Sequence, residues 1–385
     1  MIRSLNAAGH HVVAVDAARR APGLYSRATW RRAIVPDAKR QPDAFAQSVG
    51  SLALRYDVDL VLPITDESIM PLAARDRRLP LLAVPHSDIL EAARDKARTI
   101  ELASSVGVPT PESALVATSE AARVAARALG WPVVLKPRRS RVTSPDGRTV
   151  SLEVQYANDE AEVERRAAPV LALSEILVQR YHPGAGVGVE LLTHEGRPMA
   201  AFQHRRIREV PFTGGASAYR EAVPVDSTLL DHAVSLLGAL RWTGLAMVEF
   251  KVDGRNDARL LEVNGRIWGS LPLATKSGMD FPARYVDLLL NGPPRDSVIA
   301  DQYRVGTRSR HLGLDLVWIA SVLAGERRYP YLPAPARSEA LGALARLLLP
   351  SSEHDILSVR DPVPGLIDAV NCLEHIVRKA AEHRA

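Results

Sequence analysis

Two short runs decide the fold of this chain: Met247-Val-Glu-Phe250 and Leu261-Glu-Val-Asn-Gly-Arg266. Both have the apolar and polar alternation of β-strands. The segment between them, Asp253-Gly-Arg-Asn-Asp257, consists of residues that favour tight turns. We therefore predict a β-hairpin with a two-residue loop at 255–256.

The predicted hairpin register brings acidic side chains together. Glu249 lies directly opposite Glu262, and Asn264 shares the face of Glu262 because side chains alternate along a strand. Two opposed carboxylates repel each other unless a cation lies between them. Two carboxylates and an amide oxygen suit Mg²⁺, although exposed acids on a solvent-facing hairpin are the simpler alternative. Arg266 follows closely and can bind a phosphate group as a planar fork.

Lysine is rare in this chain: only six of the 49 basic residues are lysine, and the others are arginine. A GC-rich genome explains most of that bias, but each remaining lysine raises the question of whether arginine could replace it at that position. Lys136 ends an apolar strand, Pro132–Pro137, and Lys96 follows Asp95 at a predicted helix start. Lysine often binds phosphate as a point charge, although a snorkelling lysine at a strand end is an equal alternative.

The rest of the chain has two kinds of pattern. Residues 1–90 alternate helices with apolar strands at 11–16, 59–65 and 81–84, which predicts a parallel sheet covered on both faces. A helix comes first, so we expect this sheet to lack its usual first strand. Residues 132–263 are rich in strands and indicate an α+β region, and the tail after Pro294 is predominantly helical.

Composition excludes several classes of protein. Cys372 is the one cysteine, so no internal disulfide forms, and no local Cys/His cluster predicts a zinc site. No signal peptide or membrane span is visible, which predicts a cytoplasmic protein. The net charge of +5 is diffuse and does not favour nucleic-acid binding. A nicotinamide-dependent dehydrogenase is disfavoured because no G-x-G-x-x-G follows a strand.

Six motifs in order resemble the ATP-grasp superfamily over about residues 55–285. They are Asp-Lys at 95–96, Gly-Val-Pro-Thr-Pro at 107–111, Val-Val-Leu-Lys-Pro at 133–137, Leu-Val-Gln-Arg-Tyr-x-Pro-Gly at 177–184, Val-Glu-Phe at 248–250 and Leu-Glu-Val-Asn-Gly-Arg at 261–266. The chain looks most like carbamoyl-phosphate-synthase-like and carboxylate–amine ligase members.

That resemblance implies a mixed α/β and α+β fold in four parts. Residues 1–94 would form a parallel α/β pre-ATP-grasp domain, and 95–175 the first ATP-grasp subdomain, or lid. Residues 176–296 would form the second subdomain with the metal site, and 297–385 a helical C-terminal extension.

The resemblance also implies roles for individual residues. ATP would be bound by Lys96, Lys136, Gln179, Arg180, Tyr181 and Glu190, with strand 177–182 as the hinge between subdomains. Glu249, Glu262 and Asn264 would hold Mg²⁺, which Mn²⁺ can replace. Arg206, Arg208 and Arg266 would neutralise the transferring phosphoryl group.

The implied activity is ligation of a carboxylate to an amine through an acyl phosphate, with ATP converted to ADP. The alternatives are a non-catalytic ATP-binding regulator or scaffold, and carboxyphosphate chemistry as in carbamoyl phosphate synthase or biotin carboxylase. The expected partners are small molecules, with a homodimer as one expected assembly and neither nucleic acid nor membrane. Two departures from the family pattern stand out: loop 138–148 is not glycine-rich, and Gln179 replaces the common hinge glutamate.

Overall fold

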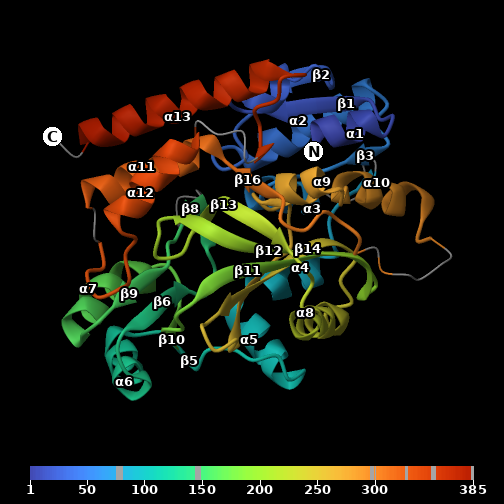
Figure 1. Ribbon diagram of the computed structural model, residues 1–385. Coiled ribbons are helices and arrows are strands. Elements are labelled where there is room, and N and C mark those ends of the chain that lie inside the picture. The colour runs from blue at the N-terminus through green and yellow to red at the C-terminus, as the bar shows by residue number, and fades with distance from the viewer. Residues whose placement is uncertain are drawn as a thin grey trace.

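The computed structural model describes residues 1–74, 81–143, 149–294, 299, 301–325, 328–347 and 353–382. Its architecture is mixed α/β, with a large central sheet, a smaller sheet beside it and helices around both (Figure 1). Among the described helices, none is long and apolar enough to cross a membrane.

The N-terminal region begins with a helix, as predicted, and contains short parallel strand pairs. One pair joins β1 and β2, and the other joins β3 and β4. The bounds of these strands are Val12–Asp16, Thr29–Ile34, Leu60–Val61 and Leu81–Leu82. The surrounding helices are α1 (Ile2–Ala7), η1 (Pro22–Tyr25), α2 (Pro42–Arg55), α3 (Asp66–Ala73) and α4 (Ser87–Arg94).

This region differs from the prediction in two ways. The prediction missed β2, whose sequence Thr-Trp-Arg-Arg-Ala-Ile is mostly exposed and lacks an apolar run. The four described strands form two separate pairs instead of one continuous sheet. Pro63 follows β3 closely and cannot donate a ladder hydrogen bond, which limits the length of that strand.

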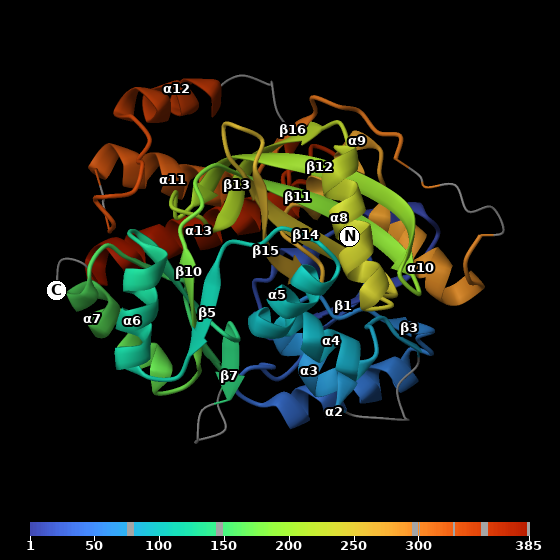
Figure 2. The same ribbon diagram turned by 90° about the horizontal axis from the view of Figure 1, so that it is seen from below.

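A four-stranded antiparallel sheet follows, in the order β5-β10-β6-β9. Its strands are Ser113–Val116, Ile176–Arg180, Val133–Pro137 and Gln155–Ala157 in that order. Helices α6 (Ser119–Leu129) and α7 (Glu160–Leu171) cover one face (Figure 2). Alternation along β6 places Val133 and Leu135 in the core under these helices, and leaves Val134 and Lys136 on the other face.

Two shorter elements flank this sheet. Helix α5 (Lys96–Ser105) precedes it, and an antiparallel pair, β7 (Arg141–Thr143) and β8 (Thr149–Ser151), follows β6. Loop 138–148 therefore contains β7, and its residues 144–148 lie outside the described part of the chain.

The central sheet has seven strands in the order β15-β14-β11-β12-β13-β16-β17. In chain order they are β11 (Ala185–His194), β12 (Arg197–Val210), β13 (Ala216–Val223), β14 (Gly244–Val252), β15 (Ala258–Asn264), β16 (Arg308–Arg310) and β17 (Glu353–His354). Helix α8 (Ser227–Ala239) packs on one face, and α9 (Leu271–Ser277) with α10 (Phe281–Asn291) packs on the other. Because both faces are covered, the central strands are almost completely buried.

The β14–β15 hairpin has the predicted pairing of Glu249 with Glu262 but a different turn. Three residues, not two, form the loop, because the Asp253 N–H donates to the Asp257 carbonyl and Asn256 takes a φ of 62°. The longer loop shifts the pairs nearest the turn by one residue. A one-residue bulge at Leu261 shifts the pairing back, so the acidic residues still face each other.

The C-terminal segment packs against the rest of the molecule and contains strands as well as helices. It contributes β16 and β17 to the central sheet, besides α11 (Leu312–Ala324), α12 (Arg337–Leu347) and α13 (Pro362–Glu382). Helix α13 lies across the molecule beside the N-terminal region and contacts both η1 and α11 (Figure 1).

Asp361 anchors this segment to the N-terminal region, where the sequence indicated only a turn. Its carboxylate accepts hydrogen bonds from Arg3 Nε at 2.8 Å, Ser26 Oγ at 2.6 Å and the Arg27 N–H at 3.1 Å. Burial opposes ionisation, but the hydrogen bonds from Ser26 and Arg3 hold the pKa of Asp361 below its usual range. Charge-assisted hydrogen bonds therefore connect the two ends of the chain.

We predict that Asp361→Asn lowers the free energy of unfolding at pH 7 by about 1–3 kcal/mol, since charge-assisted hydrogen bonds are lost. A lowered native pKa means that the carboxylate stabilises the fold fully above about pH 4 and loses this effect as the pH falls further. The stability difference between variant and wild type, measured by urea unfolding, should therefore shrink as the pH falls below about 4. Glu374→Gln, which removes an exposed ion pair with Arg20, is the control and should change stability by less than about 1 kcal/mol. Equal stability of Asp361→Asn and wild type at pH 7 would contradict the prediction.

Candidate functional site

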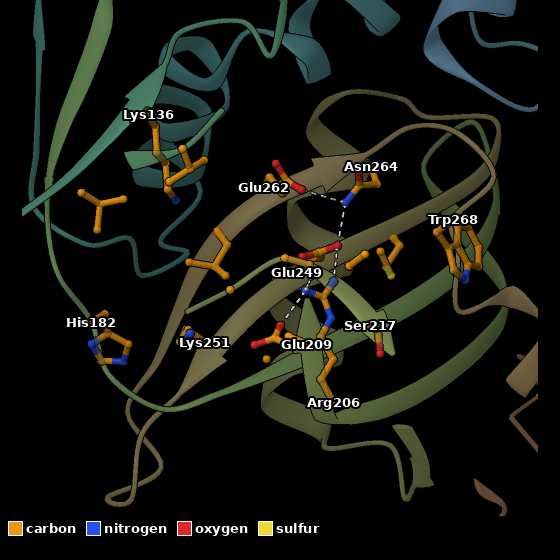
Figure 3. Close-up of a pocket in the computed structure, with 18 of the residues that line it drawn as sticks. Lys136, His182, Arg206, Glu209, Ser217, Glu249, Lys251, Glu262, Asn264 and Trp268 are labelled. Atoms are coloured by element: carbon orange, nitrogen blue, oxygen red, sulfur yellow. Dashed lines mark hydrogen bonds and ion pairs between the residues drawn. The ribbon is translucent and has the colours of Figure 1, made fainter. Parts of the chain in front are cut away.

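A cavity of about 520 Å³ lies between the four-stranded sheet and the seven-stranded sheet. Its walls include residues of β6, β9, β10, β11, β12, β13, β14 and β15, together with the start of α5 and the start of α11. In Figure 3, Lys136 and His182 lie at one end and Trp268 at the other, with Glu249, Glu262 and Asn264 between them.

The hairpin supplies the centre of the cavity. The Asn264 side-chain amide donates to Glu249 Oε1 at 2.9 Å and to Glu262 Oε1 at 3.2 Å (Figure 3). Glu249 and Asn264 are both buried, with 7% and 9% of their surface exposed. The predicted convergence of these three side chains is therefore present in the structure.

The two carboxylates have different environments. Burial raises the pKa of Glu249, with Arg206 opposing and Glu262 adding to the effect. Burial acts in the same direction on Glu262, but Lys96 and Lys136 outweigh it and lower the pKa of Glu262. The charge on Glu262 is therefore stabilised by the two lysines, while the charge on Glu249 depends on Arg206.

Arg206 bridges two acidic residues. Its Nη2 lies 2.5 Å from Glu249 Oε1, and its Nη1 donates to Glu209 Oε1 at 3.0 Å. The guanidinium thus occupies the same Glu249 oxygen that accepts from Asn264. The Arg206 guanidinium therefore offsets the charge of Glu249 at the position where a cation was predicted, and the Asn264 amide adds a hydrogen bond.

Both predicted lysines reach the cavity. Burial lowers the pKa of Lys136 to about 8, against the attraction of Glu262 and Glu249. Lys96 Nζ donates to Ser140 Oγ at 2.6 Å, on the segment that follows β6. Lys251 also lines the cavity, as its position on the strand face of Glu249 predicts.

Asp95 explains how Lys96 comes to lie close to the end of β6. Its buried carboxylate caps α5 by accepting from the N–H groups of Ala97 and Arg98. The same carboxylate pairs with Arg138, at 2.8 Å from Nη2, and the Lys96 N–H donates to the Arg138 carbonyl. The helix cap therefore also fixes the start of α5 against the residue that follows Pro137.

The predicted hinge residues lie where β10 leads into the central sheet. Gln179 is 2% exposed, and its amide nitrogen donates to Ser113 Oγ at 2.9 Å. Arg180 is exposed and pairs with Glu112, and the Tyr181 ring packs edge-on against Tyr156. All three hinge residues line the cavity.

Arg266 connects the hairpin to the N-terminal region. Its Nε lies 3.1 Å from Asp66 Oδ2 at the start of α3. A second cavity of about 210 Å³ adjoins the first and shares Lys96, Glu262 and Arg266 with it. Its wall also includes Arg94, Arg139 and Arg141, so cations dominate the charged residues around it.

Two predicted site residues do not reach either cavity. Glu190 is fully buried, accepts from Ser270 Oγ at 3.0 Å and lies 3.0 Å from His204 Nδ1. Arg208 forms a buried bidentate pair with Asp315, at 2.6 and 2.7 Å, and stacks on Tyr219.

The resemblance implied that Arg208 acts together with Arg206, and strict alternation would place both residues on one face of β12. Irregular pairing between β12 and β13 at these residues breaks that alternation. As a result Glu209, which the sequence did not single out, lines the cavity and Arg208 points elsewhere. Sequence periodicity carries no signal for this bulge.

The cavity wall also contains residues outside the predicted motifs. Trp268 is 2% exposed, packs edge-on against Phe281 and forms part of the wall. His311 and Leu314 come from the first turn of α11, in a segment whose sequence gave no motif.

The donor set at the centre fits a hard divalent cation. Glu249 and Glu262 supply carboxylate oxygens, and Asn264 supplies an amide oxygen if its nitrogen releases the two acids. The lysines and Arg266 beside them suit the phosphate oxygens with which Mg²⁺ usually completes its coordination.

Comparison with known proteins gives a consistent result. The model of the family described as "ATP-grasp in the biosynthetic pathway with Ter operon" matches residues 172–310. The carbamoyl phosphate synthase large chain of Archaeoglobus fulgidus is 27% identical over 266 residues, which are 66% of this chain and 22% of that protein. The D-alanine–D-alanine ligase of Pseudomonas entomophila is 26% identical over 219 residues, covering 53% of this chain and 67% of the ligase. The chain thus spans about a fifth of the length of the synthase.

The fold has a solved counterpart. The biotin carboxylase domain of Hydrogenobacter thermophilus 2-oxoglutarate carboxylase, in complex with MgADP, ADP and bicarbonate, has a TM-score of 0.62 and 16% identity. The match covers 80% of this chain and 70% of that domain. The matched family segment contains β10 to β16 and with them the acidic hairpin, and the wider fold contains both sheets around the cavity. Residues 172–310 of the chain therefore match an ATP-grasp family, and the chain is similar in fold to the biotin carboxylase domain.

Proposed function

We propose that this chain is an ATP-dependent ligase that activates a carboxylate as an acyl phosphate, releases ADP and joins the acyl group to an amine. The observation that carries the proposal is the convergence of Glu249, Glu262 and Asn264 between Lys136 and Arg206 in one cavity. This set combines oxygen ligands that bind a metal ion with cationic side chains that bind phosphate oxygens, and a nucleotide triphosphate site requires both.

The hinge end of the cavity is proposed to hold the adenine ring. The Gln179 amide nitrogen donates a hydrogen bond to Ser113 Oγ. Its carbonyl oxygen is therefore left to accept a hydrogen bond from the adenine amino group. Tyr181 and Val134 provide apolar surface beside it. Lys136 and Lys96 are then placed to contact the phosphates from two sides.

Glu249, Glu262 and Asn264 are proposed to hold Mg²⁺, which neutralises phosphate charge during transfer. Arg206 must leave Glu249 Oε1 when the cation binds there, and its freed guanidinium can then face the phosphoryl group. Arg266 lines both cavities and is proposed to bind the same phosphoryl group from the side opposite Arg206.

The proposed reaction has two steps. A carboxylate oxygen attacks the γ-phosphorus of ATP, and the bond to the β–γ bridging oxygen breaks to release ADP. The amine nitrogen then attacks the acyl carbon, the carbon–oxygen bond to phosphate breaks, and the nitrogen loses a proton. The chain's own residues contribute by positioning and by charge neutralisation, since this chemistry requires no covalent protein nucleophile.

Carboxyphosphate chemistry is a second candidate because the carboxylase domain that matches the fold was solved with MgADP and bicarbonate. In that case bicarbonate takes the place of the organic carboxylate. The two candidates share the nucleotide and metal residues, so they differ only in the acceptor.

The direct test is ADP release measured over pairs of amino acids and small carboxylic acids, with bicarbonate as one acceptor, in the presence of Mg²⁺. Glu262→Gln should lower the rate on the order of a hundredfold or more, since a charge-stabilising group is removed. Arg205→Met, which changes an exposed arginine outside the cavity, is the matched control and should retain wild-type activity. Release of ADP by Glu262→Gln at the wild-type rate would contradict the assignment, and no release with any acceptor would favour the non-catalytic alternative.

A second prediction concerns Lys136. Because its pKa is lowered to about 8, the free chain loses this positive charge as the pH rises through that value. Nucleotide phosphates favour the charged form, so the affinity for MgADP should fall above pH 8 by up to about tenfold per pH unit. Calorimetric titration of Lys136→Met should show weaker binding without this pH dependence, whereas Lys276→Met, on the surface, should behave as wild type. An unchanged affinity in Lys136→Met would contradict the role of Lys136.

A third prediction concerns Arg206, which competes with a cation for Glu249 Oε1. Removing a charge-assisted hydrogen bond worth about 1.5–3 kcal/mol should increase the affinity of the nucleotide-free chain for Mn²⁺ by about 10- to 100-fold. The comparison is Arg206→Met against Arg205→Met, with free Mn²⁺ followed by electron paramagnetic resonance. Equal affinities in the two variants would show that Arg206 does not compete for the site.

A further inference from the structure

A second group of ligand-type side chains lies outside the acidic hairpin. His311, Asp368 and Cys372 place one ligand atom each within 4.8 Å of one another. His311 is the residue before α11, and the other two are one turn apart on the same face of α13. We propose that these residues form a binding site for a borderline divalent cation of the Zn²⁺ type.

The distances between the three ligand atoms are somewhat longer than those around a bound zinc ion. His311 Nε2 lies 3.9 Å from Asp368 Oδ1, too far for a hydrogen bond. Zinc bonds of about 2.0–2.3 Å in tetrahedral geometry place neighbouring ligand atoms about 3.3–3.7 Å apart. The separations between the three atoms therefore need to shorten by up to about 1.5 Å to bind a common ion.

The packing around the sulfur supports the site. A side chain at residue 313 would overlap the Cys372 sulfur, so Gly313 is what allows the thiol to lie against the first turn of α11. All three ligand residues are half-buried, which limits their hydration without closing access. The geometry thus brings a thiol, an imidazole and a carboxylate to one point on the surface of α11.

The ligand types indicate which metal the site would bind. A divalent ion stabilises both a thiolate and a carboxylate ligand. A nitrogen, a sulfur and an oxygen ligand together favour Zn²⁺ over Mg²⁺, which prefers oxygen alone.

The other cluster of this kind in the described residues is a weaker candidate. His182, Asp253 and Asp257 also lie within 4.8 Å of one another. Their groups already have local partners, since His182 Nε2 contacts the Asp257 carbonyl and Asp253 Oδ1 accepts from the Arg255 and Asp257 N–H groups. Hydrogen bonds of the hairpin loop therefore account for that cluster.

Occupancy of the proposed site would affect the main cavity. His311 Nδ1 accepts a long capping hydrogen bond, 3.4 Å, from the Leu314 N–H. A metal on Nε2 moves the ring proton to Nδ1, so this capping bond is lost. Since His311 and Leu314 both line the cavity of about 520 Å³, metal binding would change the wall formed by the first turn of α11.

The test uses Co²⁺ as a spectroscopic substitute for Zn²⁺, with the chain kept reduced and anaerobic. Because Cys372 is the one cysteine, a thiolate-to-cobalt charge-transfer band in the near ultraviolet can come only from this residue. We expect one equivalent of Co²⁺ to produce the band, Zn²⁺ to remove it and excess Mg²⁺ to leave it unchanged. The band should survive Glu262→Gln, so the result is independent of the proposed ligase activity.

Single substitutions test the contribution of each proposed ligand to metal binding. Cys372→Ser should abolish the band. His311→Asn keeps a residue type that caps helices well. His311→Asn and Asp368→Asn should each weaken Co²⁺ binding at least about tenfold, because even groups behind the metal ligands contribute about 10–100-fold to affinity. Glu374→Gln, an exposed acid on the same helix, is the control and should bind as wild type. Melting curves without metal establish that each variant is folded.

Two outcomes would overturn the proposal. One is the absence of a thiolate band at saturating Co²⁺ and Cd²⁺ while a thiol reagent shows that Cys372 is reduced. The other is a band whose affinity is the same in wild type, His311→Asn and Asp368→Asn, because the thiol would then bind the ion without the other two residues.

Discussion

The repulsion between Glu249 and Glu262, paired across the hairpin, is the constraint on which the rest of the cavity depends. Cations on three other elements offset this repulsion: Arg206 on β12, Lys136 on β6 and Lys96 on α5. These elements therefore meet at the pair. The same repulsion leaves a place that a metal ion and phosphate groups can fill together.

Several elements hold these charges in position. Asp95 caps α5 and binds Arg138, which fixes the start of that helix beside the end of β6. The buried Arg208–Asp315 pair fixes α11 to β12, and Asp361 fixes the C-terminal segment to the N-terminal region. The C-terminal segment is thereby part of the framework around the cavity, and its His311 and Leu314 complete the wall.

Much of the site could be predicted because its residues lie on regular strands. The pairing of Glu249 with Glu262, the shared face of Asn264 and the burial of Lys136 follow from a period of two and from residue type. Arg208 was misplaced and Glu209 missed, because pairing irregularities in β12 change which residues face the cavity. The two-residue turn was also wrong, although a bulge at Leu261 restored the predicted pair.

The sequence by itself determined the mixed α/β class, the acidic hairpin, the two lysines and the ATP-grasp resemblance, because these depend on local pattern and spacing. Only the tertiary structure decided which groups meet across long distances in the chain. Arg206 reaches Glu249, Arg266 reaches Asp66, and His311 lies beside Asp368 and Cys372. The physical reason is that such contacts depend on packing between elements and on single-residue bulges, which leave no periodic signal in the sequence.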